Sequence, residues 1–95
     1  MIAIHGFEWD EFNLAKLAKH RVSQEEAEEI FYQAPLIDEG AYQQKGEKEY
    51  RCLGVTSSGR YLVAFFTIRK AMIRNISVRA MSRKERAVYE KTKSY

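Results

Sequence analysis

Hydrophobic and polar positions are most clearly patterned in residues 60–79, which we interpret as two strands joined by a tight turn at about Arg69 to Met72. Residues 61–68 are almost all aromatic, aliphatic or β-branched, so we expect a central strand that is apolar on both faces. In the second strand, successive side chains should point to opposite faces of the sheet. A regular strand would place Arg74, Ile76 and Val78 on one face and Ile73, Asn75, Ser77 and Arg79 on the other. Arg74 and Arg79 then lie on opposite faces unless a bulge intervenes.

The N-terminal part of the chain predicts a short strand followed by two helices. Residues 2–8 alternate as a strand does, and Asp10 is placed to cap a helix that runs to about Lys19 or His20. Trp9 is expected to anchor the core against the apolar face of that helix, which is formed by Phe12, Leu14, Ala15, Leu17 and Ala18. Ser23-Gln-Glu-Glu26 fits a capping box, which predicts a second helix over residues 24–33 that Pro35 ends. This helix is expected to bury Ala27, Ile30 and Phe31.

The remaining segments predict more strands and a last helix. Residues 36–42 are a candidate strand, 43–48 a polar turn, 50–56 a further strand, and 57–59 a hairpin turn into the central strand. Ser82-Arg-Lys-Glu85 is a second capping-box match and opens a helix that continues through Glu90. We therefore predict one α+β domain over residues 1–95, with two N-terminal helices, an antiparallel sheet of three to four strands and a C-terminal helix. The second face of the central strand needs cover, either from the last helix or from a partner protein.

Charge is divided unevenly between the two halves of the chain. Residues 1–49 contain 11 acidic and 5 basic residues, a net charge of −6, whereas residues 50–95 contain 2 acidic and 11 basic residues, a net charge of +9. The basic half favours binding to a polyanion or an acidic partner, in a manner that weakens with salt. Arginine mounted on a strand can bind phosphate in a bidentate way, so Arg74 and Arg79 suggest an anion site on the sheet. The alternative is two solvated cations at a strand edge.

Several classes of protein are not expected. The first residues lack the basic start and long apolar run of a signal peptide, and no apolar stretch approaches about 18 residues, so we expect a cytoplasmic protein without a membrane partner. The one cysteine, Cys52, is expected to be a buried hydrophobe rather than a catalytic thiol, a disulfide or a metal ligand. The glutamates at positions 25, 26, 28 and 29 are expected to form a solvated face that suits the helix dipole rather than a metal site. No cofactor is expected.

An ordered set of short motifs resembles a known family. It consists of Phe7-Glu-Trp9-Asp10, Asn13, Lys19-His20-x-Val22-Ser23-x-Glu25-Glu26-Ala27, Leu53-Gly54-x-Thr56, Gly59-Arg60, Ile73-Arg74-x-Ile76-Ser77-x-Arg79 and Glu85-Arg86-x-x-Tyr89. In this order and spacing, over residues 7–89, the chain resembles the BrnT family of bacterial toxins. Arg21 stands where that family commonly has glycine. If this position requires a positive φ, arginine would cost on the order of 1 kcal/mol relative to glycine.

The resemblance implies the toxin of a type II toxin–antitoxin system. It implies a small endoribonuclease with a RelE-like fold that cleaves RNA without a metal and so inhibits translation. It also implies neutralisation by a DNA-binding antitoxin of the ribbon-helix-helix kind, with operator DNA contacted only through that antitoxin. Glu49 stands where the family often has a basic residue, which leaves open an inactive toxin remnant.

RNA cleavage without a metal requires proton transfer and cations that stabilise the charge gained at phosphorus. His20 is the candidate for proton transfer, since an imidazole can give or take a proton near neutral pH. Arg74 and Arg79 are the candidates for charge stabilisation. The cations expected to hold the RNA backbone are Lys19, Arg51, Arg69, Lys70 and Arg83.

Each assignment has a structural alternative. His20 at a helix end could simply cap free carbonyl groups. Tyr50, Tyr61 and Tyr89 could stack on bases or pack in the core. The whole protein could be a non-catalytic module whose basic half docks onto nucleic acid or an acidic protein. It could also be an inactive toxin that binds its antitoxin and acts as a co-repressor.

Overall fold

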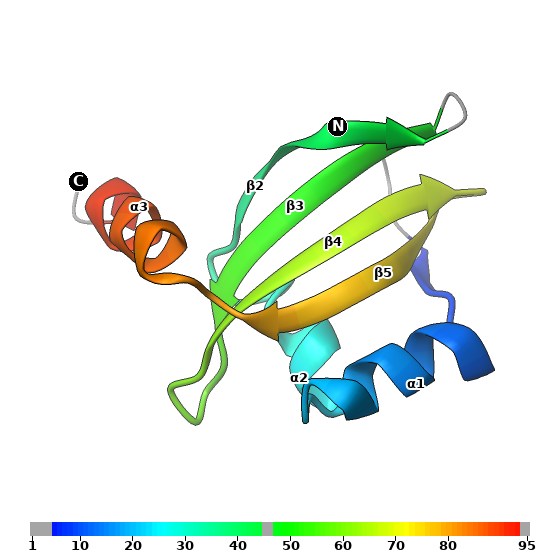
Figure 1. Cartoon of the computed structure of the whole chain (residues 1–95), viewed down its shortest axis with the longest axis horizontal. Helices are drawn as coiled ribbons and strands as arrows, with labels where there is room; N and C mark the ends of the chain where they lie inside the picture. The colour runs from blue at the N-terminus through cyan, green and yellow to red at the C-terminus, as the bar shows by residue number, and fades with distance from the viewer. Residues whose placement is uncertain (1–4, 45–46, 94–95) are drawn as a thin grey trace.

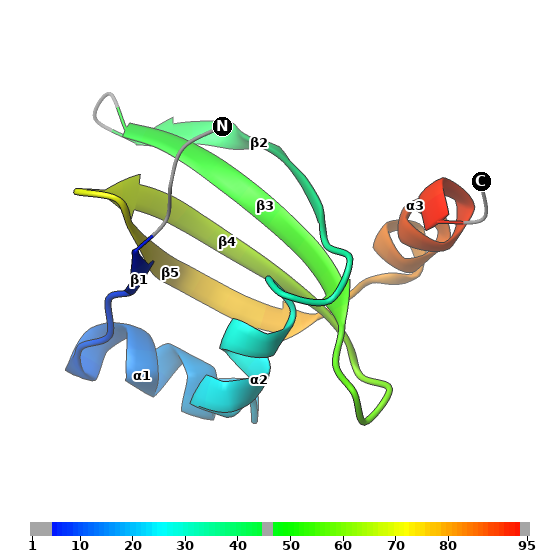
Figure 2. The same cartoon turned by 180° about the vertical axis from the view of Figure 1, so that it is seen from behind.

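A sheet of five strands in the order β1-β5-β4-β3-β2 forms the centre of the protein (Figure 1). The structure is a computed structural model that describes residues 5–44 and 47–93. Helices α1 and α2 pack on one face of the sheet, as Figure 2 shows from behind, and α3 packs against one end of the other face. The elements are β1 (Gly6–Phe7), α1 (Glu11–Lys19), α2 (Gln24–Glu29), β2 (Leu36–Gln44), β3 (Glu47–Val55), β4 (Tyr61–Arg69), β5 (Met72–Ala80) and α3 (Arg83–Lys93).

The α+β class and the C-terminal helix are confirmed, but the predicted sheet is wrong in two respects. It has five strands rather than three or four, and β1 runs parallel to β5, so the sheet is mixed. β1 is short because only Gly6 and Phe7 pair with β5, and residues 2–4 of the predicted strand lie outside the described residues. The Phe7 ring holds this segment in place, since its centroid lies 5.4 Å from that of Phe31. The alternation of residues 2–8 predicted a strand here, but alternation carries no information on its parallel pairing with β5.

The helices begin at the predicted caps. The Asp10 carboxylate accepts hydrogen bonds from the backbone N–H groups of Phe12 and Asn13 at 2.9 and 3.1 Å. Both predicted capping boxes are formed, by Ser23 with Glu26 and by Ser82 with Glu85. Among the described residues, no helix has the length and apolar character needed to cross a membrane.

Two apolar clusters occupy the two faces of the sheet. The larger one lies beneath α1 and α2 and includes Leu17, Ala27 and Ile30, packed on β3, β4 and β5. The smaller one brings Tyr89 of α3 against Leu53 and Val63. The predicted need for cover on the second face of β4 is therefore met by α3, although only at one end of that face (Figure 1).

Both N-terminal helices differ from their predicted form. Only Leu17 and Asn13 of α1 are buried, whereas Phe12 and Leu14 are 71% and 38% exposed, so the broad apolar face predicted for α1 is wrong. Helix α2 ends at Glu29 rather than at residue 33, because the N–H groups of Phe31 and Tyr32 bond three residues back and tighten the chain into turns. The polar turn predicted over residues 43–48 is also shorter, since β2 extends to Gln44 and β3 starts at Glu47; residues 45–46 lie outside the described residues.

The connection between α1 and α2 bears out the expectation for Arg21, whose φ is +55°. The Arg21 N–H bonds to the Ala18 carbonyl and the Val22 N–H bonds to the Leu17 carbonyl, which is the Schellman pattern of a helix C-terminus. Glycine is the residue that this left-handed position favours.

Replacing Arg21 with glycine should therefore raise the free energy of unfolding by roughly 1 kcal/mol, because the Cβ strain is removed. Urea denaturation followed by circular dichroism would measure this change. Arg21→Ala keeps a Cβ and serves as the control, with little expected gain. A glycine variant less stable than the original chain would contradict the expectation.

Candidate functional site

A β-bulge in β5 decides which side chains face each side of the sheet. Phe66 pairs with Asn75 and Phe65 pairs with Ser77, so Ile76 is an extra residue without a partner on β4. The alternation predicted for a regular strand is therefore wrong beyond this point. Ile73, Asn75 and Val78 are buried beneath the N-terminal helices, and the register places Arg74, Ser77 and Arg79 on the opposite face.

The bulge gathers arginines on the face that α1 and α2 leave open. Arg74 pairs with Thr67 and Arg79 pairs with Val63, four positions apart on β4, so both arginines lie on the same face. Arg51 of β3 pairs with Phe65 of β4, so it lies on the same face as Phe65. Arg69 lies four residues after Phe65 on β4 and therefore also points to that face. By register, Arg51, Arg69, Arg74 and Arg79 thus start on one side of the sheet, which α3 covers only at one end (Figure 1). The Arg74 guanidinium, however, reaches the edge of the sheet, where it pairs with Glu8 and Asp10 at the start of α1.

Arg79 is held in a fixed position by a carboxylate and an aromatic ring. Its Nη1 and Nη2 atoms donate to the two Glu85 carboxylate oxygens at 2.8 and 3.0 Å. The guanidinium carbon lies 5.2 Å from the centre of the Phe65 ring. Glu85 is oriented in turn by Ser82, whose N–H donates to it at 2.7 Å. The helix cap of α3 therefore positions a cation on the sheet.

The chemistry of Glu85 follows from these contacts. The hydrogen bond from Arg79 is the main cause that lowers the pKa of the Glu85 carboxyl, to about 2, with the Ser82 N–H adding to it against the effect of burial. A carboxylate with so low a pKa remains ionised at neutral pH and is a poor proton acceptor. Glu85 thus serves to orient Arg79 rather than to move protons.

Arg51 has a similar arrangement on the neighbouring strands. Its Nε and Nη2 atoms donate to the Asp38 carboxylate at 3.0 and 2.6 Å, across the β2–β3 pair. Phe65 lies between Arg51 and Arg79, because it pairs with Arg51 across the sheet and contacts Arg79 through its ring. The open face therefore carries two oriented guanidinium groups on either side of one aromatic side chain.

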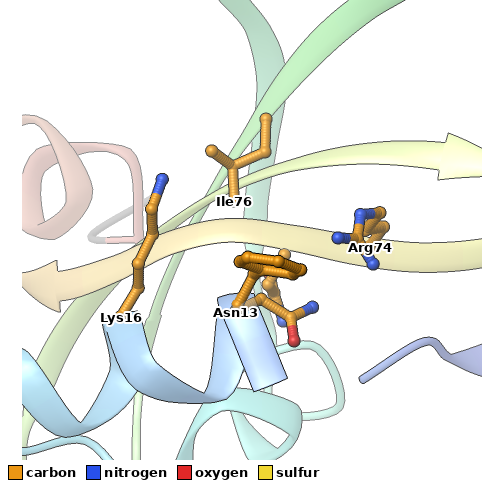
Figure 3. Close-up of a pocket in the computed structure, with 6 residues that line it drawn as sticks. Asn13, Lys16, Arg74 and Ile76 are labelled. Carbon is orange, nitrogen blue, oxygen red and sulfur yellow. The ribbon is translucent and has the colours of Figure 1, made fainter. Parts of the chain in front are cut away.

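Arg74 is bound to the start of α1. It pairs with Glu8 at 3.1 Å and with Asp10 at 2.6 Å. The pKa of Asp10 is lowered, first by the hydrogen bond from the Asn13 N–H and then by Arg74. Arg74 therefore joins β5 to the helix cap, and the pocket beside it is lined by Phe12, Asn13, Lys16, Asn75 and Ile76 and not by His20 or Arg79 (Figure 3).

His20 lies at the other end of α1, where it is the C-cap residue and its side chain is exposed. None of the contacts recorded for the described residues joins it to Arg74 or Arg79. Helix α1 nevertheless runs alongside β5 in the same direction. At its start, Asp10 pairs with Arg74, near the beginning of β5. After its end, the Arg21 carbonyl accepts from Arg60, which lies just before Leu62, the β4 partner of Ala80 at the end of β5. The C-terminal end of α1, where His20 is the C-cap residue, thus lies at the same end of the sheet as the C-terminal end of β5, which carries Arg79. Figure 1 shows α1 and β5 side by side.

The predicted RNA-backbone residues are spread over the molecule. Lys19 is exposed in the last turn of α1, and Arg83 is exposed at the start of α3. Arg69 and Lys70 lie at the tight turn between β4 and β5, where Lys70 and Ala71 both have positive φ. Only Arg51 and Arg69 share the face of Arg74 and Arg79 by register.

Sequence reasoning missed the acidic partners of these cations. Glu85 carried a usable signal, because its capping box places it six residues after Arg79 at the end of a strand. Asp38 carried none, since its pairing with Arg51 depends on the β2–β3 register. The glutamates of α2 also bind within the fold: Glu26 pairs with Arg60 at 2.8 Å and Glu28 accepts from the Trp9 indole at 2.7 Å.

The described ranges, 5–44 and 47–93, contain no group of three or more His, Cys, Asp or Glu residues that could hold a metal ion. Cys52 is buried, and its burial raises the pKa of the thiol to about 12. A thiol with this pKa is not a nucleophile at neutral pH.

Residues 9–85 match a family of ribonuclease toxins from type II toxin–antitoxin systems. That family is BrnT, and because the match extends over most of the chain, the chain belongs to it. None of the curated proteins matches the chain. Membership implies an RNA substrate and an antitoxin partner.

The Glu85 contacts make stability dependent on acid pH. Its folded pKa of about 2 lies below the ordinary 4.5, so the ionised carboxylate contributes stability that is present above about pH 4.5 and is lost as the pH falls towards 2. Glu85→Gln should lower the free energy of unfolding by roughly 1 to 3 kcal/mol at neutral pH, and the difference should shrink between about pH 5 and 2. Urea denaturation over that range would measure it, with Glu25→Gln, on exposed α2 surface, as the control. A difference independent of pH would refute the Arg79–Glu85 coupling.

Proposed function

We propose that this protein is a metal-independent endoribonuclease toxin that cleaves RNA and inhibits translation in the cytoplasm. The observation that carries the proposal is the set of arginines that one sheet face collects through the β5 bulge. Fixed guanidinium groups suit the phosphates of RNA better than mobile surface lysines, because less conformational freedom is lost on binding. In this proposal the domain has a RelE-like fold and acts as a hydrolase on RNA.

In the proposed chemistry, charge stabilisation comes from the arginine side of the β5 edge and proton transfer from the α1 side. The ribose 2′-hydroxyl attacks the adjacent phosphorus and displaces the 5′-oxygen of the next nucleotide, which gives a 2′,3′-cyclic phosphate. Arg79 stabilises the negative charge that develops on the phosphate oxygens. Arg74 pairs with β4 four positions away from the partner of Arg79, or roughly 13 Å along the strand, so it is proposed to hold a neighbouring phosphate. His20 takes the proton of the 2′-hydroxyl, since its exposed imidazole lies at the Arg79 end of that edge, and water donates a proton to the leaving 5′-oxygen. Beyond β1, which pairs only with Met72 and Ile73, RNA can cross the β5 edge from the arginine face to α1.

A phosphate of the substrate can compete with the carboxylates that bind Arg79 and Arg51. Arg79 and Arg51 present bidentate geometry to carboxylates, and a phosphate offers the same pair of acceptor oxygens. The remaining RNA contacts are proposed for Lys19, Arg69, Lys70 and Arg83, which lie outside this central group. Neutralisation is proposed to come from a ribbon-helix-helix antitoxin, which alone contacts operator DNA.

A second candidate function is favoured by the same ion pairs. Arg74 and Arg79 are each engaged by carboxylates, so they could be structural in a chain that binds its antitoxin without cleaving RNA. Such a protein would be an inactive toxin that acts as a co-repressor, or a non-catalytic RNA-binding module. Binding of RNA that weakens with salt, without any cleavage, would favour this function.

Cleavage by the purified chain is the decisive measurement. A labelled single-stranded RNA should be cut in the presence of EDTA, and His20→Ala or Arg79→Ala should reduce the rate by about 100-fold or more. Arg74→Ala should also reduce it, with some loss of stability because Asp10 and Glu8 lose their partner. Circular dichroism would show that the variants fold.

Arg86→Ala is the matched control, since Arg86 is an exposed arginine of α3 that pairs with Glu90 and should leave cleavage unchanged. Full activity of both the His20 and Arg79 variants would remove the proposed mechanism. Loss of cleavage on chelation would remove its metal independence.

A further inference from the structure

Helix α1 is apolar around much of its circumference but buries little of that surface. Its apolar residues are Phe12, Leu14, Ala15, Leu17 and Ala18. Of these, only Leu17 is buried in the described structure, whereas Phe12 is 71% exposed and Leu14 is 38% exposed. A helix that is apolar on more than one side is normally covered on more than one side. The surface of α1 that faces away from the sheet therefore calls for a partner.

The exposed apolar residues of α1 lie on adjoining parts of one surface. Successive residues of an α-helix are turned by about 100°, so Ala15 lies nearly opposite the buried Leu17. We call the surface around Ala15 the outer face of α1; it consists of Phe12, Leu14, Ala15 and Ala18. The two alanines let the axis of another helix come close, and the two larger side chains can pack against it. Figures 1 and 2 both show α1 at the edge of the molecule.

A hollow beside the outer face can take one side chain of a partner. It measures about 180 Å³ and lies between α1 and β5. Phe12 and Lys16 line it from α1, and Arg74 and Ile76 line it from β5 (Figure 3). Sites for drug-sized ligands start at roughly 300 Å³, so the hollow suits one apolar side chain rather than a separate ligand.

The charge that α1 offers to a partner is mainly positive. Asp10, at its start, is paired with Arg74, and Glu11 is exposed in the first turn. Lys16 and Lys19 are exposed towards the other end, and neither forms an ion pair with the residues that the structure describes. The outer face therefore fits a partner whose apolar side is bordered by acidic residues.

Two other kinds of partner fit this surface less well. A contact between two copies centred on α1 is limited by the length of a nine-residue helix, roughly 14 Å. Stable interfaces between proteins bury on the order of 1,200 Å² or more, which is a large area for so short a helix. RNA gains nothing from Leu14, Ala15 or Ala18, because its backbone is bound through phosphates and Glu11 among them repels phosphate. The remaining candidate is the antitoxin partner that membership of the family implies.

We propose that the antitoxin places an amphipathic helix on the outer face of α1, with acidic residues beside Lys16 and Lys19. Recognition of a helix in this way uses apolar side chains spaced three or four residues apart. One of these side chains enters the hollow beside Ile76. The inference rests on the antitoxin partner, extends the neutralisation step of the proposed function, and does not depend on which residues cleave RNA.

This mode of binding accounts for neutralisation. The RNA is proposed to cross the β5 edge from the arginine face to α1, which runs alongside that edge. A helix seated on α1 occupies the α1 side of this path, where His20 ends the same helix. Neutralisation then requires no contact with Arg51 or Arg79 on the open face.

The test is binding of the cognate antitoxin to the purified chain, measured by isothermal titration calorimetry. Phe12→Ala and Leu14→Ala should each weaken binding, by about 30-fold for Phe12→Ala, which corresponds to the ~2 kcal/mol of an interface hot spot. Tyr32→Ala and Val88→Ala are the matched controls, because they shorten side chains that are 74% and 49% exposed elsewhere, and affinity should not change. Circular dichroism should show that all four variants fold. Unchanged affinity of both the Phe12 and the Leu14 variants would overturn the inference.

Charge reversal on α1 tests the acidic border of the partner helix. Lys16→Glu should slow association with the antitoxin about tenfold at low ionic strength, and salt should reduce the difference because it screens exposed charges. Lys84→Glu reverses an exposed lysine of α3 and is the control, with a smaller expected effect. Association of Lys16→Glu that is as fast as that of the original chain, or faster, would contradict the acidic border.

Two further measurements decide between the antitoxin and the other partners. RNA that is 2′-O-methylated throughout cannot be cleaved through its 2′-hydroxyl. If Phe12→Ala weakened binding of this RNA and left antitoxin binding unchanged, the outer face would be an RNA surface and the inference would be overturned. A dimer of the free chain that Phe12→Ala dissociates, with antitoxin binding unchanged, would likewise assign the surface to a second copy. Protection of the α1 amides from hydrogen exchange in the antitoxin complex would support the inference.

The two proposals fail separately. A chain that binds its antitoxin through Phe12 and Leu14 but cleaves no RNA would overturn the ribonuclease and leave the antitoxin surface intact. A chain whose RNA cleavage is inhibited by the same antitoxin concentration with and without Phe12→Ala and Leu14→Ala would overturn the surface and leave the ribonuclease intact.

Discussion

One extra residue in β5 determines the chemistry of both faces of this sheet. Without the Ile76 bulge, Arg79 would face the core beneath α1 and α2, and Val78 would face the open side. Because of the bulge, Val78 points into the core, where it is fully buried. Arg79 points to the other face, where it contacts Phe65 and Glu85. It also leaves Asn75 buried without a partner in the described structure. The arginine face and the pocket are thus two results of a single local irregularity.

The acidic half of the chain is used to orient the basic half. Arg51, Arg60 and Arg74 come from the basic half, and their partners Asp38, Glu26 and Asp10 come from the acidic half. Such pairs are partly exposed, so each contributes little to stability. Their main effect is geometric, because they hold guanidinium groups in defined positions. The net charge of +9 on residues 50–95 therefore overstates the charge available to a polyanion.

Local signals in the sequence were reliable, and long-range ones were not. Caps at Asp10, Ser23 and Ser82 follow from a few adjacent residues, and the positive φ of Arg21 follows from its place after a helix. The faces of β5 could not be predicted beyond the bulge, since alternation assumes unbroken pairing with β4. The apolar residues of α1 suggested a broad buried face, but that helix packs through Leu17 and Asn13 at the sheet edge and leaves Phe12 outside. The candidate cations remain predictions, and the acidic partners of Arg51 and Arg79 depend on contacts that the sequence pattern did not predict.

The features that cost stability are concentrated along one side of the molecule. Arg21 holds a left-handed conformation after the C-terminal end of α1, whereas the unsatisfied Asn75 and the exposed Phe12 line the same pocket at its N-terminal end. A chain selected only for stability would readily replace such residues, since apolar or glycine alternatives exist for each. Local strain that persists where the rest of the fold is well satisfied points to a use for the strained groups. The β5 edge and α1 are therefore where binding should be sought.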